Sequence, residues 1–398
     1  MFIELFKFKC YLTNILGIQL FIFIFIFSGC AIQDIGQNSN IDQNDIQQQN
    51  TKNKINQNYI DNNVNDIKIK EPSVSIKISF IGDNVLGDYK GAIGATFNKK
   101  FYEVNGDYKY FSKGVIDVLS KDDLSVGNLE GVLSDKNLNN AFKKQFSFKG
   151  ISKYANILKE ASIEIVNIAN NHTRDYGVEG FKDTLHSLNS ANIEYFGEGN
   201  LNIIEIKGKK FGFGGHRGWN LNIKNKVRDE IKKLYSMGAD IVIFTFHWGE
   251  ERENIPNNIQ RELAHFAIDN GASLVIGHHP HVLQGIEEYK GRKIVYSLGN
   301  FIYGGAKNPK DKDTIIYQAE FVFNGKSSLD STYISNLSSI DTLENNITIV
   351  HNIIPASISS KDSYNNYQPL IYDKFTKGYK RILDRLENYS IPLNKSNF

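Results

Sequence analysis

The sequence predicts an α/β fold with a largely parallel sheet, and three observations lead to this class. From Ser73 onward, segments with the apolar pattern of strands alternate with segments whose apolar residues recur at helical spacing. Residues 241–246 form a nearly continuous apolar run, which is typical of a central strand in a parallel sheet. Residues 257–269 have a helical pattern that ends at Asn270-Gly271, a common helix C-terminus.

The first half of this region begins with a strand, because apolar and polar residues alternate strongly over residues 74–81. Short apolar segments predict further strands at 124–126, 163–169 and 193–196. Apolar residues at helical spacing predict helices at 110–119, 154–160 and 178–189.

The second half continues the same alternation. Strands are predicted at 211–213, 241–246, 273–276 and 294–297, and helices at 227–237 and 257–269. After Gly305 the pattern weakens. Residues 314–323 are predicted to be an edge strand or a hairpin partner, and residues 372–389 an amphipathic C-terminal helix. We find no internal boundary and expect a single domain over residues 73–398.

The composition narrows the classes of function. The 398 residues are 41% hydrophobic and 23% charged, close to the average for soluble globular proteins. A net charge of +2 argues against a strongly basic nucleic-acid-binding protein, so no nucleic-acid partner is expected; a local basic groove is the alternative that net charge leaves open. Two cysteines exclude a disulfide scaffold and a cysteine-rich zinc module.

Residues 1–29 have the pattern of a bacterial signal peptide. Lys7 and Lys9 precede a 13-residue apolar run at 15–27, which is too short to cross a bilayer core of about 30 Å as a helix. The following Ser28-Gly29-Cys30 resembles a lipobox, which implies cleavage before Cys30 and lipidation of its sulfur. We therefore expect an extracytoplasmic lipoprotein that is anchored to the membrane; the alternative is a plain N-terminal membrane anchor.

Residues 30–72 are predicted to be a disordered linker. Asn and Gln occupy 17 of the 42 positions from 31 to 72, and Tyr59 is the only aromatic residue there. Such a segment cannot bury enough apolar surface to offset the entropy lost on ordering. The expected role is a flexible spacer between the membrane and the folded domain.

Polar residues that can bind a metal follow five of the predicted strands, where open α/β sheets place their ligands. These residues are Asp83, Glu130, Asn171 with His172, His247, and His279 with His281. Each has an ordinary alternative. Asp83 and Asn171 could cap turns, and His247 could be a hydrogen-bonded core residue. Taken together, five such positions favour a metal site.

The segment Gly277-His278-His279-Pro280-His281 is the sharpest local feature. In extended backbone, His279 and His281 would point to one side and could grip one ion, while His278 would face elsewhere. Imidazoles combined with carboxylate and amide oxygens suit Mn, Zn or Fe. We expect one or two divalent ions.

Three further residues border the expected cleft. Arg217 is the best candidate for holding an anionic substrate, because its planar fork suits carboxylate or phosphate; a solvated loop charge is the alternative. Trp248 and Asn300 are the other candidate substrate-binding residues. His265 could support a metal ligand from outside.

Six motifs resemble the CapA family of poly-γ-glutamate capsule biosynthesis proteins, which is related to the calcineurin-like metallophosphoesterases. They are SFIGDNVLG (79–87), GNLEGVL (127–133), ANNHTRDYG (169–177), FHWG (246–249), VIGHHPHVLQ (275–284) and YSLGNF (296–301). The resemblance covers roughly residues 74–304 and implies a four-layer α/β/β/α metallophosphatase-like sandwich.

The resemblance also implies residue roles. It places the metal ligands at Asp83, Glu130, Asn171, His247, His279 and His281. It places a catalytic histidine at His172, which Asp175 would orient. One departure from the wider superfamily is Val85, which stands where the motif Asp-x-His has histidine.

The implied function is biosynthesis or processing of poly-γ-glutamate or a related anionic envelope polymer. The expected reaction is hydrolysis or amide transfer that depends on a divalent metal. Two alternatives remain open: a lipoprotein that binds or tethers polymer without catalysis, and a metallophosphoesterase that acts on phosphate esters.

Overall fold

The structure is a computed structural model that describes residues 73–141, 144–323, 340–343 and 347–395. These residues lie in one compact unit that extends from Lys70 to Phe398. The expected signal peptide (1–29), the lipidation site Cys30 and the linker (30–72) lie outside the described residues. Among the helices that are described, none combines the length and hydrophobicity needed to cross a membrane.

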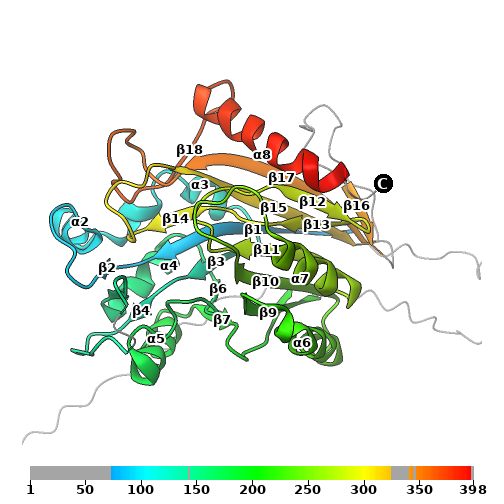
Figure 1. Ribbon diagram of the computed structural model, residues 1–398, viewed down its shortest axis with the longest axis horizontal. Helices are drawn as coiled ribbons and strands as arrows, with labels where there is room; N and C mark the ends of the chain where they lie inside the picture. Colours follow the sequence, from blue (N-terminus) through cyan, green and yellow to red (C-terminus); the bar gives the residue numbers. More distant parts are fainter. Residues whose placement is uncertain (1–72, 142–143, 324–339, 344–346, 396–398) are drawn as a thin grey trace, which may run out of the picture. The chain divides into compact units, whose positions relative to one another are not determined.

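The larger sheet has the strand order β16-β17-β15-β1-β3-β6-β7, with β14 beside β1 and β18 beside β17 (Figure 1). Strands β14, β1, β3, β6 and β7 pair in parallel, whereas β15, β17, β16 and β18 pair antiparallel. The bounds are β1 (Val74–Val85), β3 (Leu124–Leu129), β6 (Ile165–Asn167), β7 (Glu194–Phe196), β14 (Asn300–Tyr303), β15 (Asp313–Phe323), β16 (Ile340–Leu343), β17 (Ile347–Ser357) and β18 (Leu370–Ile371).

The second sheet has the order β12-β13-β11-β10-β9-β8, in which β9, β10, β11 and β13 are parallel. Its strands are β8 (Asn202–Ile206), β9 (Lys209–Gly218), β10 (Ile241–Trp248), β11 (Leu274–His278), β12 (Ile286–Tyr289) and β13 (Arg292–Val295). A small third sheet joins β2 (Asp88–Tyr89), β5 (Phe148–Gly150) and β4 (Val132–Leu133).

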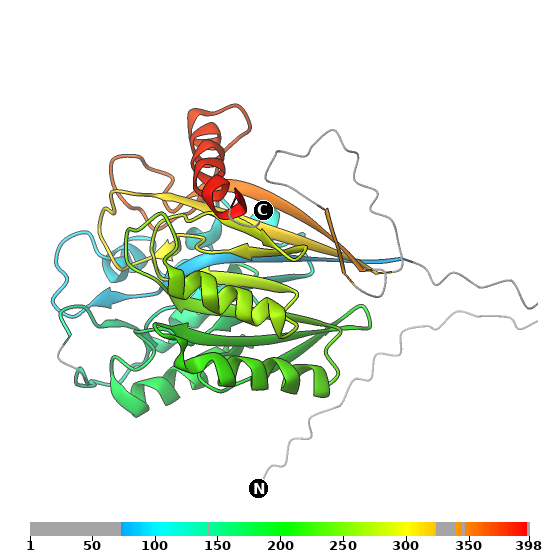
Figure 2. The same cartoon turned by 45° about the vertical axis from the view of Figure 1, so that its right-hand side comes forward.

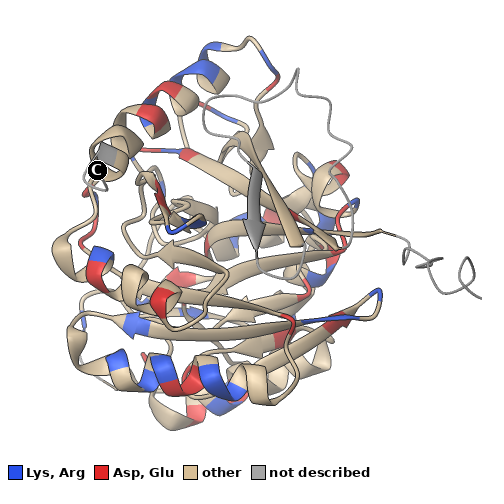
Figure 3. Ribbon diagram, turned by 90° about the vertical axis from the view of Figure 1, so that its right-hand side faces the viewer, with Lys and Arg blue, Asp and Glu red and all other residues tan. Residues whose placement is uncertain are grey.

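Helices α6 and α7 cover the outer face of the second sheet, α3, α4 and α5 cover that of the larger sheet, and α8 packs against β12 and β17, one strand of each sheet (Figures 1 and 2). The α-helices are α2 (Phe97–Glu103), α3 (Ile116–Leu119), α4 (Ala155–Glu160), α5 (Gly177–Ser190), α6 (Lys224–Ser236), α7 (Asn258–Asp269) and α8 (Lys377–Lys395), and the 3-10 helices are η1 (Tyr108–Ser112), η2 (Ser152–Tyr154) and η3 (Leu221–Ile223). Figure 3 shows basic and acidic residues interspersed along α8, the helix that leads to the C-terminus.

The main core lies between the two sheets. It joins alternate residues of β1, such as Ile76 and Ile78, to alternate residues of β10, such as Ile241 and Ile243. The intervening residues face outward: Val242 and Phe244 pack with α6 and α7, while the other sheet packs with α3, α4 and α5. This arrangement confirms the predicted α/β/β/α sandwich.

A β-bulge in β1 sets the direction of Asp83. Phe80 pairs with Val126 of β3, but the next pair is Asp83 with Asn128, so β1 contains one extra residue. Before the bulge, Phe80 belongs to the core between the sheets and Ile81 to the outer core. Because the extra residue changes the alternation, Asp83 also points between the sheets.

Two predicted elements differ from the structure. Residues 110–119 do not form one helix but split into η1 and α3 around Gly114, which bridges to Leu370. A Cβ at Gly114 would lie 2.4 Å from the Pro369 carbonyl oxygen, so this contact interrupts the helix. Of the two alternatives for residues 314–323, the edge strand is wrong, because β15 lies between β1 and β17, is buried on both faces and pairs antiparallel with both neighbours.

Hydrogen-bonded ion pairs to the buried Asp313 hold the C-terminal helix α8 at the start of β15. The carboxylate of Asp313 accepts hydrogen bonds from Arg381 Nη2 at 2.6 Å and from Arg385 Nη1 at 2.5 Å. The next residue, Thr314, donates to the Leu298 carbonyl oxygen at 2.9 Å. These contacts connect α8 to the loop before β14 that carries Gly299.

Gly82→Ala tests the close approach at the bulge. A Cβ at this position would lie 2.1 Å from the Gly299 carbonyl oxygen, which also accepts the Asp83 amide at 3.0 Å. We expect the forced movement to lower the free energy of unfolding by about 2–3 kcal/mol in urea titrations. Gly208→Ala is the control, because no described residue other than its two chain neighbours lies within 4 Å of its Cβ, and its positive φ alone costs about 1 kcal/mol. Equal losses for the two variants would contradict the role of the close approach.

Candidate metal centre

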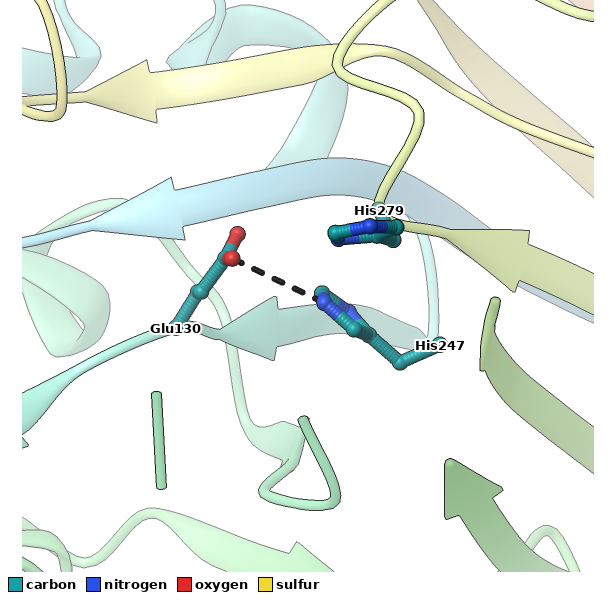
Figure 4. Close-up of side chains that lie close together, drawn as sticks. All are labelled: Glu130, His247 and His279. Carbon is teal, nitrogen blue, oxygen red and sulfur yellow. Dashed lines mark ion pairs between the residues drawn. The ribbon is translucent and has the colours of Figure 1, made fainter. Parts of the chain in front are cut away.

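The candidate metal centre lies where parallel strands of both sheets end. Asp83 lies near the end of β1, Glu130 follows β3, and His247 is on β10. His279 and His281 follow β11. Figure 4 shows Glu130, His247 and His279 pointing toward one another, and the Glu130 Oε1 to His247 Nε2 distance is 3.6 Å.

Two overlapping sets of side chains could each hold an ion. Glu130, His247 and His279 form one set, and Asp83, Glu130 and His281 form the other. In each set, one ligand atom per residue lies within 4.8 Å of the others. Because both sets contain Glu130, its carboxylate could serve one ion or bridge two.

Glu130 shows that the site fits a cation. Its side chain is fully buried, and neither carboxylate oxygen has a hydrogen-bond partner. A buried carboxylate without a partner is costly, and a divalent ion would supply the missing positive charge. The donors are imidazole nitrogens and carboxylate oxygens, a ligand set that suits Mn, Zn or Fe.

Burial shifts the ionisation of these groups. It raises the pKa of Glu130 to about 8, lowers the pKa of His279 to about 3, and holds the pKa of His247 well below its usual value. Burial would also lower the pKa of His281, but Glu130 and Asp83 outweigh it and raise this pKa to about 10. His247 and His279 are therefore neutral at pH 7 and offer lone pairs to a metal.

Asp83 is held by residues that we did not select from the sequence. Asn128 Nδ2 donates to Asp83 Oδ1 at 2.8 Å, and Asn128 Oδ1 accepts from Asn167 Nδ2 at 2.9 Å. His278 Nδ1 lies 3.4 Å from Asp83 Oδ1. The prediction that His278 faces elsewhere is therefore wrong. Asn128 could have been found from its spacing, because it precedes Glu130 by two residues.

The histidine segment reaches the site by a different backbone from the one predicted. Strand β11 ends at His278, and both His279 (φ 97°) and His281 (φ 57°) lie in the left-handed region. Their rings still lie together, with centroids 5.5 Å apart. The pairing therefore depends on a strained turn and not on extended backbone.

Asn171, His172 and Asp175 lie on the loop after β6. Asn171 Oδ1 is 2.7 Å from His247 Nε2. His172 Nε2 lies 3.8 Å from Glu130 Oε1, while its Nδ1 is 2.7 Å from Asp175 Oδ2. Asp175 also accepts from the Phe148 amide at 2.9 Å and pairs with Lys144 at 3.1 Å. The loop therefore holds His172 with its Nε2 toward the centre.

The residues selected for substrate binding occupy different environments. Asn300 is buried, and its Oδ1 lies 2.9 Å from His281 Nδ1, so it orients that ring. Arg217 is 46% exposed and pairs with Glu198 at 3.2 Å. The placement of Trp248 at the cleft is wrong: it is fully buried, stacks on Phe246 and faces the helix layer.

Two other positions from the sequence analysis, Val85 and His265, can be placed, together with one that it did not select. A different tryptophan, Trp219, lies beside the centre, with its ring 4.6 Å from that of His279 and 40% of the residue exposed. Val85 is buried in a small apolar cluster with Phe148 and Tyr303. His265 does not support a metal ligand, because it pairs with Glu287 at 2.9 Å on another part of the second sheet.

Comparison with known proteins identifies the family. The family described as bacterial capsule synthesis protein PGA_cap matches residues 77–304, a range that contains every residue of the candidate centre. The chain belongs to this family. The match agrees with the expected CapA resemblance and with the α/β fold.

Individual PGA_cap relatives are moderately similar. The PGA biosynthesis protein CapA of Bacillus subtilis is 30% identical over 279 residues, which cover 65% of this chain and 70% of that protein. The capsule biosynthesis protein CapA of Bacillus anthracis is 31% identical, over 56% of this chain and 60% of that protein. A probable polyglutamine synthesis accessory protein of Mycobacterium tuberculosis is 25% identical, over 34% and 44%.

Glu130→Gln tests the centre of this PGA_cap protein. The folded pKa of Glu130 is about 8, above its usual 4.5, so ionisation destabilises the metal-free fold as pH rises through this interval. In EDTA at pH 8 we expect the variant to match the wild type or exceed it by about 1–3 kcal/mol in urea unfolding. The difference should vanish below pH 4.5.

Added Mn²⁺ should raise the thermal midpoint of the wild type and have little effect on Glu130→Gln, because the shared ligand is lost. Two results would exclude this role: a variant that is less stable without metal at pH 8, or one that binds Mn²⁺ as tightly as the wild type does.

Proposed function

We propose that this chain is a divalent-metal-dependent hydrolase or amide transferase of an acidic envelope polymer such as poly-γ-glutamate. The observation that carries the proposal is the unpartnered Glu130 carboxylate, shared by two possible ligand sets. The polymer class is suggested by the names of the relatives, which refer to PGA, capsule and polyglutamine synthesis.

The metal would supply the electrophile and an activated water, since a bound divalent ion polarises a carbonyl and lowers the pKa of its water. Asp83, Glu130, His247, His279 and His281 would hold it, with Asn171 as an amide-oxygen ligand. The burial of these side chains favours metal-assisted chemistry, because water that is excluded from the centre does not screen the charges inside it.

His172 would move the proton. Asp175 Oδ2, at 2.7 Å, fixes the proton of His172 on Nδ1, so Nε2 is the atom that faces the centre. The Phe148 amide and the Lys144 ammonium in turn hold Asp175. Nε2, which then carries a lone pair, would accept a proton from the attacking water and deliver it to the leaving amine. A residue placed for proton transfer is a reason to prefer catalysis to passive tethering of polymer.

His279→Ala and His172→Ala separate metal binding from proton transfer. We expect His279→Ala to lose both bound Mn²⁺ and turnover of γ-glutamyl peptides, because it removes a ligand. His172→Ala should keep Mn²⁺ affinity but lower kcat by about 10²–10⁴-fold. The exposed His186→Ala is the control and should behave as wild type.

A panel of phosphate esters assayed alongside the γ-glutamyl peptides distinguishes the alternatives. Turnover that survives both chelation and His279→Ala would refute the metal-dependent mechanism. Polymer binding without turnover would instead favour the tethering role, and turnover of phosphate esters alone would favour the phosphoesterase.

The proposal includes export and attachment through Cys30, for which the sequence pattern at 1–30 is the support. Cys30→Ser should abolish incorporation of labelled fatty acid and move the protein from the membrane fraction to the soluble fraction, because the Cys30 sulfur is the atom that would carry the lipid. Unchanged membrane attachment of this variant would favour a plain N-terminal anchor.

A further inference from the structure

Two arginines, one on a loop and one on a strand of the second sheet, meet at the rim of the candidate metal centre. Arg174 lies on the loop after β6, and Arg217 is on β9. Both contact the carboxylate of Glu198: Arg174 Nε lies 3.2 Å from Oε2, and Arg217 Nη2 lies 3.2 Å from Oε1. One buried carboxylate thus holds two guanidinium groups and leaves a net charge of about +1.

Chain connectivity places both arginines next to the reacting groups. Arg217 is the register partner of His247 on the neighbouring strand. It also shares the inward-facing parity of Phe211 and Phe213 on β9. Arg174 follows His172 by two residues, and His172 Nε2 lies 3.8 Å from Glu130.

Both guanidinium groups remain open to a ligand. The side chains of Arg174 and Arg217 are 36% and 46% exposed, whereas Glu198 is only 11% exposed. Each arginine uses one nitrogen for Glu198, and the remaining N–H groups of a planar fork suit a carboxylate. Phe181 lies under Arg174, with the guanidinium carbon 4.3 Å from the ring centroid, and limits its movement.

Trp219 adds an apolar surface to this rim. It follows Arg217 by two residues, and its ring is 4.6 Å from His279 and 6.0 Å from His247. The residue is 40% exposed, so a ligand that approaches these two histidines can pack against it. An indole beside two guanidinium groups matches a polyamide chain that carries carboxylates and has methylene groups between its amides.

We propose that Arg174, Arg217 and Trp219 form a carboxylate-binding subsite that selects an acidic polymer and presents its backbone to the metal centre. This inference rests on the proposed function and adds the residues that determine specificity. Glu198 is a positioning residue, because it fixes both forks without contacting the substrate.

The test compares two probes with the full chain in the presence of Mn²⁺: a γ-linked glutamate pentamer and the neutral γ-linked glutamine pentamer. We expect the wild type to bind the acidic probe at least tenfold more tightly. Arg174→Gln with Arg217→Gln should weaken binding of the acidic probe by roughly 10–100-fold, because two charge-assisted contacts are lost. Binding of the neutral probe and of Mn²⁺ should stay unchanged.

Two variants sharpen this result. Trp219→Ala should weaken both probes equally, since its contact is apolar. Arg228→Gln, a change to an exposed arginine on α6, is the matched control and should leave both affinities unchanged. If the double variant does not fold, each single arginine variant can be tested in the same way, and each should weaken binding of the acidic probe by roughly tenfold.

The outcomes separate the two proposals. If the arginine variants bind the acidic probe as the wild type does, the subsite is refuted while the metal-dependent activity can stand. A wild type that binds neither probe would overturn both. Inorganic phosphate provides a last check. If it displaces the acidic probe by binding the metal, and does so equally in the wild type and in the arginine variants, the subsite is also rejected.

Discussion

The arrangement of this protein depends on a carboxylate that is buried without a hydrogen-bond donor. Glu130 is fully enclosed between two sheets, and the groups nearest to its oxygens are imidazole rings. A folded chain retains such a group only if something offsets the cost of desolvation. The neighbouring histidines agree with this constraint. Burial keeps His247 and His279 neutral, whereas Asp83 and Glu130 raise the pKa of His281.

The sandwich brings these groups together because parallel strands of both sheets end at the same edge. Sequence-distant residues such as Asp83 and His281 meet there at 3.3 Å. The edge also required local exceptions to regular geometry. A bulge redirects Asp83, and two histidines take left-handed backbone conformations. Strain of this kind concentrates at functional sites, where the surrounding fold can hold it.

Much of the site was accessible from sequence because strand ends are visible as polar residues after apolar runs. The wrong placements of Trp248 and His278 share one cause, which is that the alternation of side-chain direction along β10 and β11 was not followed. On β10, inward residues are odd-numbered, so His247 faces the centre and Trp248 faces the helices. The same alternation on β3 would have identified Asn128, because it lies two residues before Glu130 and therefore faces the same side.

Other features could not be predicted from a single sequence. The contacts from Glu198 to Arg174 and Arg217 join three loops or strand ends, and nothing in the local sequence specifies that they meet. The positions of His279 and His281 depend on a turn whose positive φ values no local pattern indicates. The breaking of the helix at Gly114 depends on a chain segment about 250 residues away.

The hydrogen bonds that hold α8 on β15 have a consequence for folding. Arg381 and Arg385 hold Asp313, the next residue holds the Leu298 carbonyl, and the Gly299 carbonyl accepts the amide of Asp83. Helix α8 therefore supports Asp83, the candidate ligand that comes first in the chain. Because these supporting residues lie far later in the chain than Asp83, its position is fixed only after α8 has packed onto β15.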